Sequence, residues 1–334
     1  TSPRLEVTMA QRRSRDVAAD ELPDAIYRAY EEHADDWRRG HLGASVVGHR
    51  CDRYLWLAFR WAAKPDYDGK LLRLFERGER EEDWVIRDLE RAGLTVTSRD
   101  EDGEQIRISE GHLSGSVDGL VEGVTGNPDA VHVLEIKTSN KKSFERLKQK
   151  RVRSAQPRHY VQMQLYMDGL GLEHALYLAV CKDSDEIYAE SVPFDQKVAS
   201  KQKARAKEII ESSTPPARLD ADMPPCVLVS KDGTRWPCQY LGLCHGKAMP
   251  QRHCRTCVDA TPGTHGKWSC GLPNGGTLSL AEQKRGCSQQ LSIPPIVNAH
   301  VSELCSKERE VTYQFADGDL VTQHRLLPDG EGYP

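Results

Sequence analysis

A charged pair lies within one of the most apolar stretches of the chain, and this conflict limits what the chain can fold into. Residues 131–137 read Val-His-Val-Leu-Glu-Ile-Lys, a composition that predicts a β-strand covered on both faces. Because side chains alternate along a strand, Glu135 and Lys137 share one face. Leu134 and Ile136 share the other. A charge in a covered strand is costly unless it is paired or bound to a metal, so we expect a functional site here.

A third charged residue, Asp118, lies in the stretch before this strand, and a predicted hairpin turn separates the two. Asp118 stands between small residues in Gly-Ser-Val-Asp-Gly, and the Gly-Asn-Pro sequence at 126–128 predicts the turn. Asp118, Glu135 and Lys137 therefore form the pattern D-x16-E-x-K. Carboxylate oxygens are the ligands that hard cations such as Mg²⁺ prefer. The alternative is a plain β-hairpin with a surface Asp and a Glu–Lys pair on an edge strand.

The D-x16-E-x-K pattern resembles the core of the PD-(D/E)XK nucleases. The wider pattern resembles the RecB-like and lambda-exonuclease-like branches of that superfamily, which implies a restriction-endonuclease-like α/β core with a mixed β-sheet flanked by helices. The predicted elements follow the order expected of these nucleases: a helix at 71–92, the hairpin, a helix at 159–169 and a buried strand at 175–180.

The resemblance also implies roles for individual residues. Asp118 and Glu135 would hold one or two Mg²⁺ (or Mn²⁺) ions together with the carbonyl oxygen of Ile136. Lys137 would orient the attacking water and stabilise negative charge during phosphodiester hydrolysis. Glu82, in the helix at 71–92, matches an acid that completes the metal shell in these nucleases, and an exposed acidic helix face is the alternative for it.

A basic stretch follows the predicted site. The net charge of −4 gives no sign of nucleic-acid binding, but residues 136–158 contain nine Lys and Arg against one acid. Its position beside the site favours a phosphate-contacting surface over a solvated helix face, so DNA is the expected partner. Gln162 and Tyr166 share a helix face and match a Q-x-x-x-Y motif that helps to position DNA in RecB-like nucleases. The expected DNA-binding residues are thus Gln162, Tyr166, Lys141, Lys142, Arg146 and Lys148.

Ten cysteines in a chain without a recognisable secretory signal suggest metal ligands rather than disulfides. Iron–sulfur RecB-like nucleases end with C-x2-C-x5-C, which pairs with an early cysteine. Here Cys238 and Cys244 give C-x5-C, Cys51 stands before an aromatic-rich stretch, and Cys226 would replace the cysteine missing at Arg235. Four thiolates suit a [4Fe–4S] cluster or tetrahedral Zn²⁺. For Cys51 alone, a small buried apolar residue is the alternative.

The C-terminal region contains a second cysteine pattern, C-x2-C-x12-C-x16-C. This spacing predicts a four-thiolate Zn²⁺ module, with His253 or His265 as a substitute ligand. The segment resembles a cysteine-rich tail found on bacteriophage-encoded nucleases of this kind. The four predicted ligands are Cys254, Cys257, Cys270 and Cys287.

The sequence therefore predicts an N-terminal extension at 1–39, a nuclease domain at 40–250 and a metal-binding tail with a terminal hairpin at 251–334. No apolar run approaches the roughly 20 residues that a membrane span requires. We expect a cytoplasmic protein, in the host cytoplasm if it is phage-encoded.

The expected activity is that of a metal-dependent DNA exonuclease in recombination, repair or phage DNA metabolism. A recombination or annealing protein is the expected second partner. The alternatives are a catalytically inactive DNA-binding module of the same fold and a zinc-containing adaptor that binds a protein partner.

Overall fold

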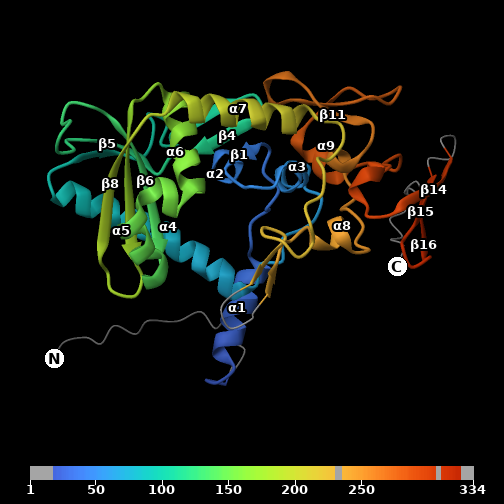
Figure 1. The fold of residues 1–334 in the computed structure, drawn as a ribbon, viewed down its shortest axis with the longest axis horizontal. Helices are drawn as coiled ribbons and strands as arrows, with labels where there is room; N and C mark the ends of the chain where they lie inside the picture. Colours follow the sequence, from blue (N-terminus) through green and yellow to red (C-terminus); the bar gives the residue numbers. More distant parts are fainter. Residues whose placement is uncertain (1–17, 230–234, 306–309, 325–334) are drawn as a thin grey trace, which may run out of the picture. The chain divides into compact units, whose positions relative to one another are not determined.

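The computed structural model describes residues 18–229, 235–305 and 310–324 (Figure 1). These residues divide into two units. The smaller unit contains helix α1 (Leu22–Glu32) and the first part of α4 (Gly69–Arg91). All other elements belong to the larger unit. No described helix is both long enough and apolar enough to cross a membrane.

Within the smaller unit, Gly69 begins α4 directly against the backbone of α1. A Cβ atom at Gly69 would lie 1.9 Å from the carbonyl oxygen of Tyr27, so no other residue fits there. The Gly69 N–H donates to Glu31 Oε1 at 2.7 Å. These contacts fix where α4 starts.

A five-stranded mixed sheet organises the larger unit, in the order β2-β5-β6-β7-β8. Strands β6 and β7 run parallel, and the other neighbours run antiparallel. This arrangement confirms the mixed α/β fold expected from the sequence. The strands are β2 (Thr95–Thr97), β5 (Gly119–Glu122), β6 (His132–Ser139), β7 (His174–Cys181) and β8 (Ile187–Pro193).

Helices cover both faces of this sheet, as the apolar character of β6 requires. On one face, Val85 of α4 packs with Leu134 and Ile136 of β6. On the other face, α5 (Lys141–Ala155) and α6 (Pro157–Leu170) pack over Val133 and Tyr177. Helix α7 (Gln196–Glu211) packs against α6. The alternation predicted for β6 is thus confirmed, and Glu135 lies on the α6 side.

A smaller sheet, β1-β4-β3, adjoins the site region. The chain leaves it at Ser116 and enters the five-stranded sheet at Gly119, so the segment expected to be one hairpin strand is divided between two sheets. Ser116 pairs with Arg107, whereas Gly119 pairs with Leu134. Asp118 lies at this crossing. The strands are β1 (Leu42–Gly43), β3 (Arg107–Glu110) and β4 (Leu113–Ser116).

Two short helices, α2 (Ala44–Val47) and α3 (Asp52–Phe59), follow β1. Cys51 caps the amino terminus of α3, and its Sγ accepts the Tyr54 N–H at 3.4 Å. The remaining elements are α8 (Leu241–His245), α9 (Leu280–Arg285), β9 (Val227–Val229), β10 (Arg235–Pro237), β11 (Ala260–Pro262), β12 (Trp268–Cys270), β13 (Thr277–Leu278), β14 (His300–Cys305), β15 (Glu310–Gln314) and β16 (Leu320–Gln323).

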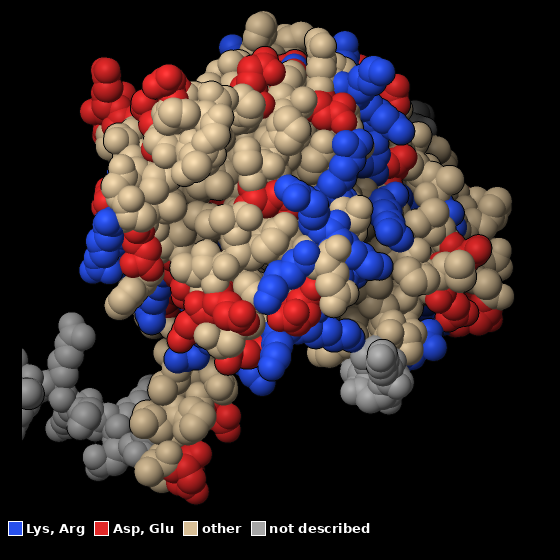
Figure 2. Space-filling model, turned by 60° about the vertical axis from the view of Figure 1, so that its left-hand side comes forward, with Lys and Arg blue, Asp and Glu red and all other residues tan. Residues whose placement is uncertain are grey.

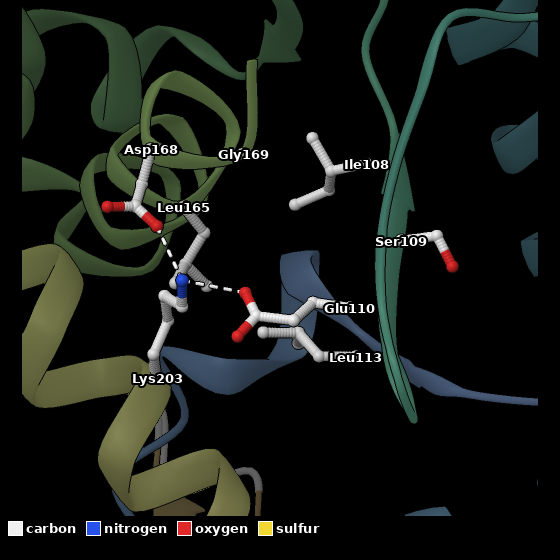
Figure 3. Close-up of a pocket in the computed structure, with 8 residues that line it drawn as sticks. All are labelled: Ile108, Ser109, Glu110, Leu113, Leu165, Asp168, Gly169 and Lys203. Carbon is white, nitrogen blue, oxygen red and sulfur yellow. Dashed lines mark hydrogen bonds and ion pairs between the residues drawn. The ribbon is translucent and has the colours of Figure 1, made fainter. Parts of the chain in front are cut away.

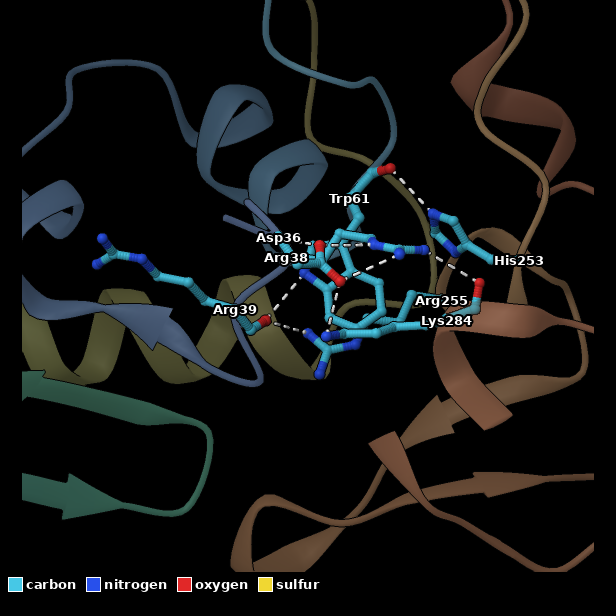
Figure 4. Close-up of polar contacts among 7 residues, drawn as sticks. All are labelled: Asp36, Arg38, Arg39, Trp61, His253, Arg255 and Lys284. Carbon is cyan, nitrogen blue, oxygen red and sulfur yellow. Dashed lines mark hydrogen bonds and ion pairs between the residues drawn. The ribbon is translucent and has the colours of Figure 1, made fainter. Parts of the chain in front are cut away.

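The C-terminal segment contributes directly to the main core. Arg255 is buried, with its guanidinium carbon 3.7 Å from the ring centroid of Trp61 (Figure 4). It donates to the carbonyl oxygens of Phe59 and Gly40 at 2.9 and 2.7 Å. Trp268 is fully buried, and its ring lies 5.3 Å from that of Phe59. Gly40, Phe59 and Trp61 therefore pack with Arg255 and Trp268 in one core of the larger unit.

Candidate nuclease site

Asp118 is tied to β6 by a backbone hydrogen bond. Its Oδ2 accepts the Ile136 N–H at 2.6 Å. This contact fixes the carboxylate beside the strand that carries Glu135, although the two residues are 17 positions apart. The passage of the chain from the smaller sheet to the five-stranded sheet thus places Asp118 beside β6.

The ammonium group of Lys137 lies among three oxygens. Its Nζ is 2.6 Å from Glu135 Oε1 and 3.4 Å from Asp118 Oδ2. It also donates to the Ile136 carbonyl oxygen at 2.7 Å. These oxygens belong to the three residues that the sequence analysis named as Mg²⁺ ligands. The lysine cation lies among these oxygens, and carboxylate and carbonyl oxygens are donors that suit a hard divalent ion.

Three acids, Asp118, Glu135 and Glu82, surround the single cation Lys137 at this site. Glu135 is fully buried, and burial raises its pKa to about 8, against the opposing effect of the Lys137 charge. The negative charges of Asp118 and Glu82 contribute to this raised pKa. Burial alone would lower the pKa of Lys137, but these three acids raise it. A divalent cation would relieve the repulsion among the carboxylates.

Glu82 is brought to the same site by α4. It is half-buried, and its charge acts on both Glu135 and Lys137. It therefore lies within electrostatic reach of the two residues, as an acid that completes a metal shell would.

Gln162 and Tyr166 reach the site from α6, but both side chains are buried. Gln162 Nε2 donates to Glu135 Oε2 at 3.1 Å and to Tyr166 Oη at 3.1 Å. In this structure their polar groups thus hold the Glu135 carboxylate. Gly115 allows the close approach of Tyr166, because a Cβ there would lie 2.8 Å from the tyrosine ring.

Sequence reasoning missed two residues beside this site. Tyr177 is paired with Glu135 in the parallel register of β6 and β7, and it is buried. Its Oη lies 2.9 Å from His159 Nδ1. His159 precedes Gln162 by three positions on α6, so the helical spacing that relates Gln162 to Tyr166 would have drawn attention to it.

The basic stretch divides into paired and unpaired cations. Three cations of the basic stretch form ion pairs with acids in β8 or next to it: Lys148 with Glu186, Arg151 with Glu190, and Arg153 with Asp195. Four others, all exposed, make no ion pair within the part of the chain that the structure describes: Lys141, Lys142, Arg146 and Lys150. Figure 2 brings the α5 side of the larger unit forward, and a band of Lys and Arg crosses this face.

The structure brings the middle cysteines into one region. Burial, and then the other three thiols, raise the pKa of Cys238 to about 11, against a backbone hydrogen bond that lowers it. The Cys238 N–H donates to the Cys226 carbonyl oxygen at 2.7 Å. Cys51 and Cys244 act electrostatically on both. Burial raises the pKa of the Cys244 thiol against the opposing effect of the Arg53 cation, so positive charge adjoins the group.

The cysteines of the C-terminal pattern are also neighbours. Burial, and then the thiols of Cys287, Cys257 and Cys270, raise the pKa of Cys254 to about 12. His253, the substitute ligand, is instead buried with its Nε2 3.0 Å from the Trp61 carbonyl oxygen. Both cysteine groups offer donors that suit thiophilic metals.

No three His, Cys, Asp or Glu side chains within residues 18–229, 235–305 and 310–324 have the arrangement of a finished metal site. Beside Asp118 and Glu135, the Lys137 ammonium group lies among the oxygens. Thiolate sulfurs are suitable metal donors, but no three thiols of the described cysteines are arranged to bind one ion.

A separate pocket carries charges that neutralise one another. Lys203 of α7 lies 2.6 Å from Glu110 Oε2 and 2.8 Å from Asp168 Oδ2 (Figure 3). These pairs join α7, β3 and α6. Their mutual pairing gives the pocket a structural role.

No family model and no curated protein matches the chain. An alkaline exonuclease, LHK-Exo from Laribacter hongkongensis, aligns over 56% of this chain and 90% of its own, with 16% identity and a TM-score of 0.37. LHK-Exo in complex with dAMP gives the same coverage and TM-score at 15% identity. A phage-related exonuclease from Haemophilus somnus 129PT aligns over 50% of this chain and 78% of its own, with 17% identity and a TM-score of 0.32.

Proposed function

We propose that this protein is a metal-dependent DNA nuclease that acts as an exonuclease. One observation carries the proposal. Oxygens of Asp118, Glu135 and Ile136 all lie within 3.4 Å of one cationic nitrogen, Lys137 Nζ. A buried point surrounded by carboxylate and carbonyl oxygens is the coordination environment that Mg²⁺ or Mn²⁺ selects.

Each residue would then have a distinct role. Asp118, Glu135 and the Ile136 carbonyl would hold the metal, with Glu82 completing the acidic shell. The bound ion would supply the positive charge that activates water and shields the phosphate during attack. Lys137, displaced from the oxygens, would orient the attacking water and stabilise developing charge.

The substrate would be held through its phosphate backbone. Lys141, Lys142 and Arg146 are exposed on α5, which directly follows β6. Lys148 would contribute less, because Glu145 and Glu186 already partly neutralise it. Exonuclease action and a setting in recombination, repair or phage DNA metabolism, with a recombination or annealing protein as partner, follow from the family resemblance of the sequence motifs.

Cleavage of end-labelled linear DNA and of closed circular DNA tests this proposal. The wild type should degrade linear DNA in Mg²⁺, should stop in chelator and should spare the circle. Asp118→Asn and Glu135→Gln should each lower the rate by about a thousandfold or more. Glu186→Gln, which removes an exposed acid, is the matched control and should cleave normally. Both site variants cleaving at the wild-type rate would remove the assignment.

The inactive-module alternative predicts a different pattern. Such a protein would bind DNA in Ca²⁺ and leave it intact in Mg²⁺ and Mn²⁺. An adaptor would bind neither DNA nor Mg²⁺ and would depend on its C-terminal segment. Binding and cleavage measured on one preparation separate these alternatives.

We also propose metals at both cysteine groups. The four middle thiols would hold a [4Fe–4S] cluster or Zn²⁺, and the C-terminal four would hold Zn²⁺. Anaerobically purified protein that is brown and contains iron supports the cluster. Two zinc ions per chain without iron support zinc at both places, and a metal-free folded chain would exclude both.

A further inference from the structure

A hydrogen bond joins Tyr177 to His159, and its direction depends on which imidazole nitrogen carries the proton. Tyr177 is 1% exposed, and its hydroxyl contacts His159 Nδ1 at 2.9 Å. If the buried hydroxyl donates its proton, His159 Nδ1 is the acceptor within reach. A neutral ring whose Nδ1 accepts a hydrogen bond carries its proton on Nε2.

The Nε2–H of His159 has no hydrogen-bond partner among the described residues, whereas Nδ1 is fully used. The ring is half-buried. It lies within electrostatic reach of two cations, Lys137 of the site and Arg158. Burial and these two charges lower its pKa to about 3, so the ring is neutral at any pH where the protein would act. A neutral N–H donor beside two cations offers a site that suits a phosphate oxygen.

We propose that His159 contacts the DNA phosphate at the nuclease site, with its Nε2–H donating to a non-bridging oxygen. Tyr177 is a positioning residue that fixes the required tautomer through Nδ1. This inference rests on the proposed nuclease function and adds a phosphate-contacting residue to it. The competing explanation is a histidine whose only task is to satisfy the Tyr177 hydroxyl.

Amide substitutions separate these explanations, because Asn and Gln place their polar atoms at different ring positions. His159→Gln can place an N–H near the Nε2 position. His159→Asn can accept from Tyr177 near the Nδ1 position but offers no donor toward the phosphate. We expect His159→Asn and His159→Ala to lower the cleavage rate by about a hundredfold, and His159→Gln to recover at least tenfold of that loss, as roughly expected when one donor is restored.

Two controls exclude a folding or metal defect. Ca²⁺ binding by calorimetry should be unchanged in every His159 variant, because the carboxylates remain. Tyr177→Phe should leave Ca²⁺ binding intact and should allow the proton to populate Nδ1. The ¹⁵N shifts of the imidazole report this tautomer directly, with Nε2–H in the wild type and a mixture in Tyr177→Phe.

Inorganic phosphate serves as a probe that is independent of cleavage. Titration into the wild type should shift the His159 Nε2 resonance, and Tyr177→Phe should need more phosphate to reach the same shift. Rescue by Asn instead of Gln, or an Nε2 resonance insensitive to phosphate, would overturn the inference while leaving the nuclease proposal intact. If the wild type cleaves no DNA, the proposed function fails, and the tautomer and phosphate titration still decide whether His159 binds phosphate.

Discussion

Lys137 Nζ lies 2.6 Å from Glu135 Oε1, inside the group of oxygens that would bind a metal. The lysine therefore acts as an internal counterion of the metal-free protein. We expect Lys137→Met to lower the free energy of unfolding in chelator by about 3 kcal/mol at pH 9, because it leaves a buried carboxylate unpaired. The loss should shrink at pH 6, where Glu135 takes up a proton.

Urea denaturation in EDTA and in Ca²⁺ measures this effect. Ca²⁺ should restore most of the lost stability, since it replaces the missing positive charge. Lys148→Met removes an exposed ion pair and should change the free energy of unfolding much less than Lys137→Met does. Equal losses in the two variants would mean that Lys137 is no counterion.

The raised pKa of Glu135 gives the proposed metal site a pH dependence of defined sign. Because the folded-state pKa, about 8, exceeds the ordinary value of 4.5, the folded protein binds more protons than the unfolded chain between these values. Stability in chelator should fall as pH rises through this window. Metal binding expels the proton, so Ca²⁺ affinity should rise by up to tenfold per pH unit below pH 8. Calorimetry from pH 6 to 9 measures this slope, which Glu135→Gln should abolish.

Residue pattern alone was sufficient to predict the covered strand and its helices. The alternation of β6, the helical spacing of Gln162 and Tyr166 and the apolar run of β7 are local properties, and the structure has these elements. The crossing at Asp118 is not local. A short run of Gly and Ser can pair in either sheet, and only the partners Arg107 and Leu134 decide where it divides.

Contacts between distant segments account for most of what the sequence did not reveal. Glu190 lies 38 positions after Val152, yet its Oε2 accepts the Val152 N–H at 2.9 Å. The same carboxylate pairs with Arg151. The packing of Trp268 on Phe59 is likewise invisible to local pattern. Tyr177 could have been placed opposite Glu135 only after the register of β6 and β7 was known.

Helix α5 is interrupted at Arg151, which has φ 58° and ψ 165°. This region of the backbone map is populated almost only by glycine and costs a side-chain-bearing residue about 1–3 kcal/mol. Arg151→Gly and Arg151→Ala both remove the pair with Glu190, but only glycine relieves the strain. We expect the glycine variant to be more stable than the alanine variant by about 1 kcal/mol or more in urea denaturation. Equal stability would indicate that α5 is not bent at this residue.

The paired and unpaired cations of α5 should differ in their effect on DNA binding. Each phosphate neutralised by the protein contributes about −0.9 to the slope of log affinity against log salt concentration on duplex DNA. The double variant Lys141→Gln/Lys142→Gln should flatten this slope by about 1–2 units. Arg151→Gln/Arg153→Gln should change it less, since Glu190 and Asp195 already neutralise these charges. Fluorescence anisotropy in Ca²⁺ measures both, and identical slopes would exclude α5 as the DNA-binding surface.

The C-terminal segment should be required for folding of the core of the larger unit. The predicted division into a domain at 40–250 and a tail at 251–334 implies that a chain ending near Pro250 would fold. Such a truncation would remove Arg255 and Trp268, leaving the apolar surfaces of Phe59 and Trp61 uncovered. We now expect the truncated protein to be insoluble or to lack a cooperative unfolding transition.

Trp268→Ala tests the same packing in the full-length chain and should cost about 3–5 kcal/mol. Leu320→Ala is the matched control, because Leu320 is 62% exposed in the same C-terminal region and should lose less than about 0.5 kcal/mol. A soluble, cooperatively folded truncation together with a mild Trp268→Ala variant would instead establish residues 251–334 as a separable module. Metal content measured on these proteins then shows whether thiol-bound metal, rather than the Phe59–Trp268 contact, supplies the folding energy of the segment.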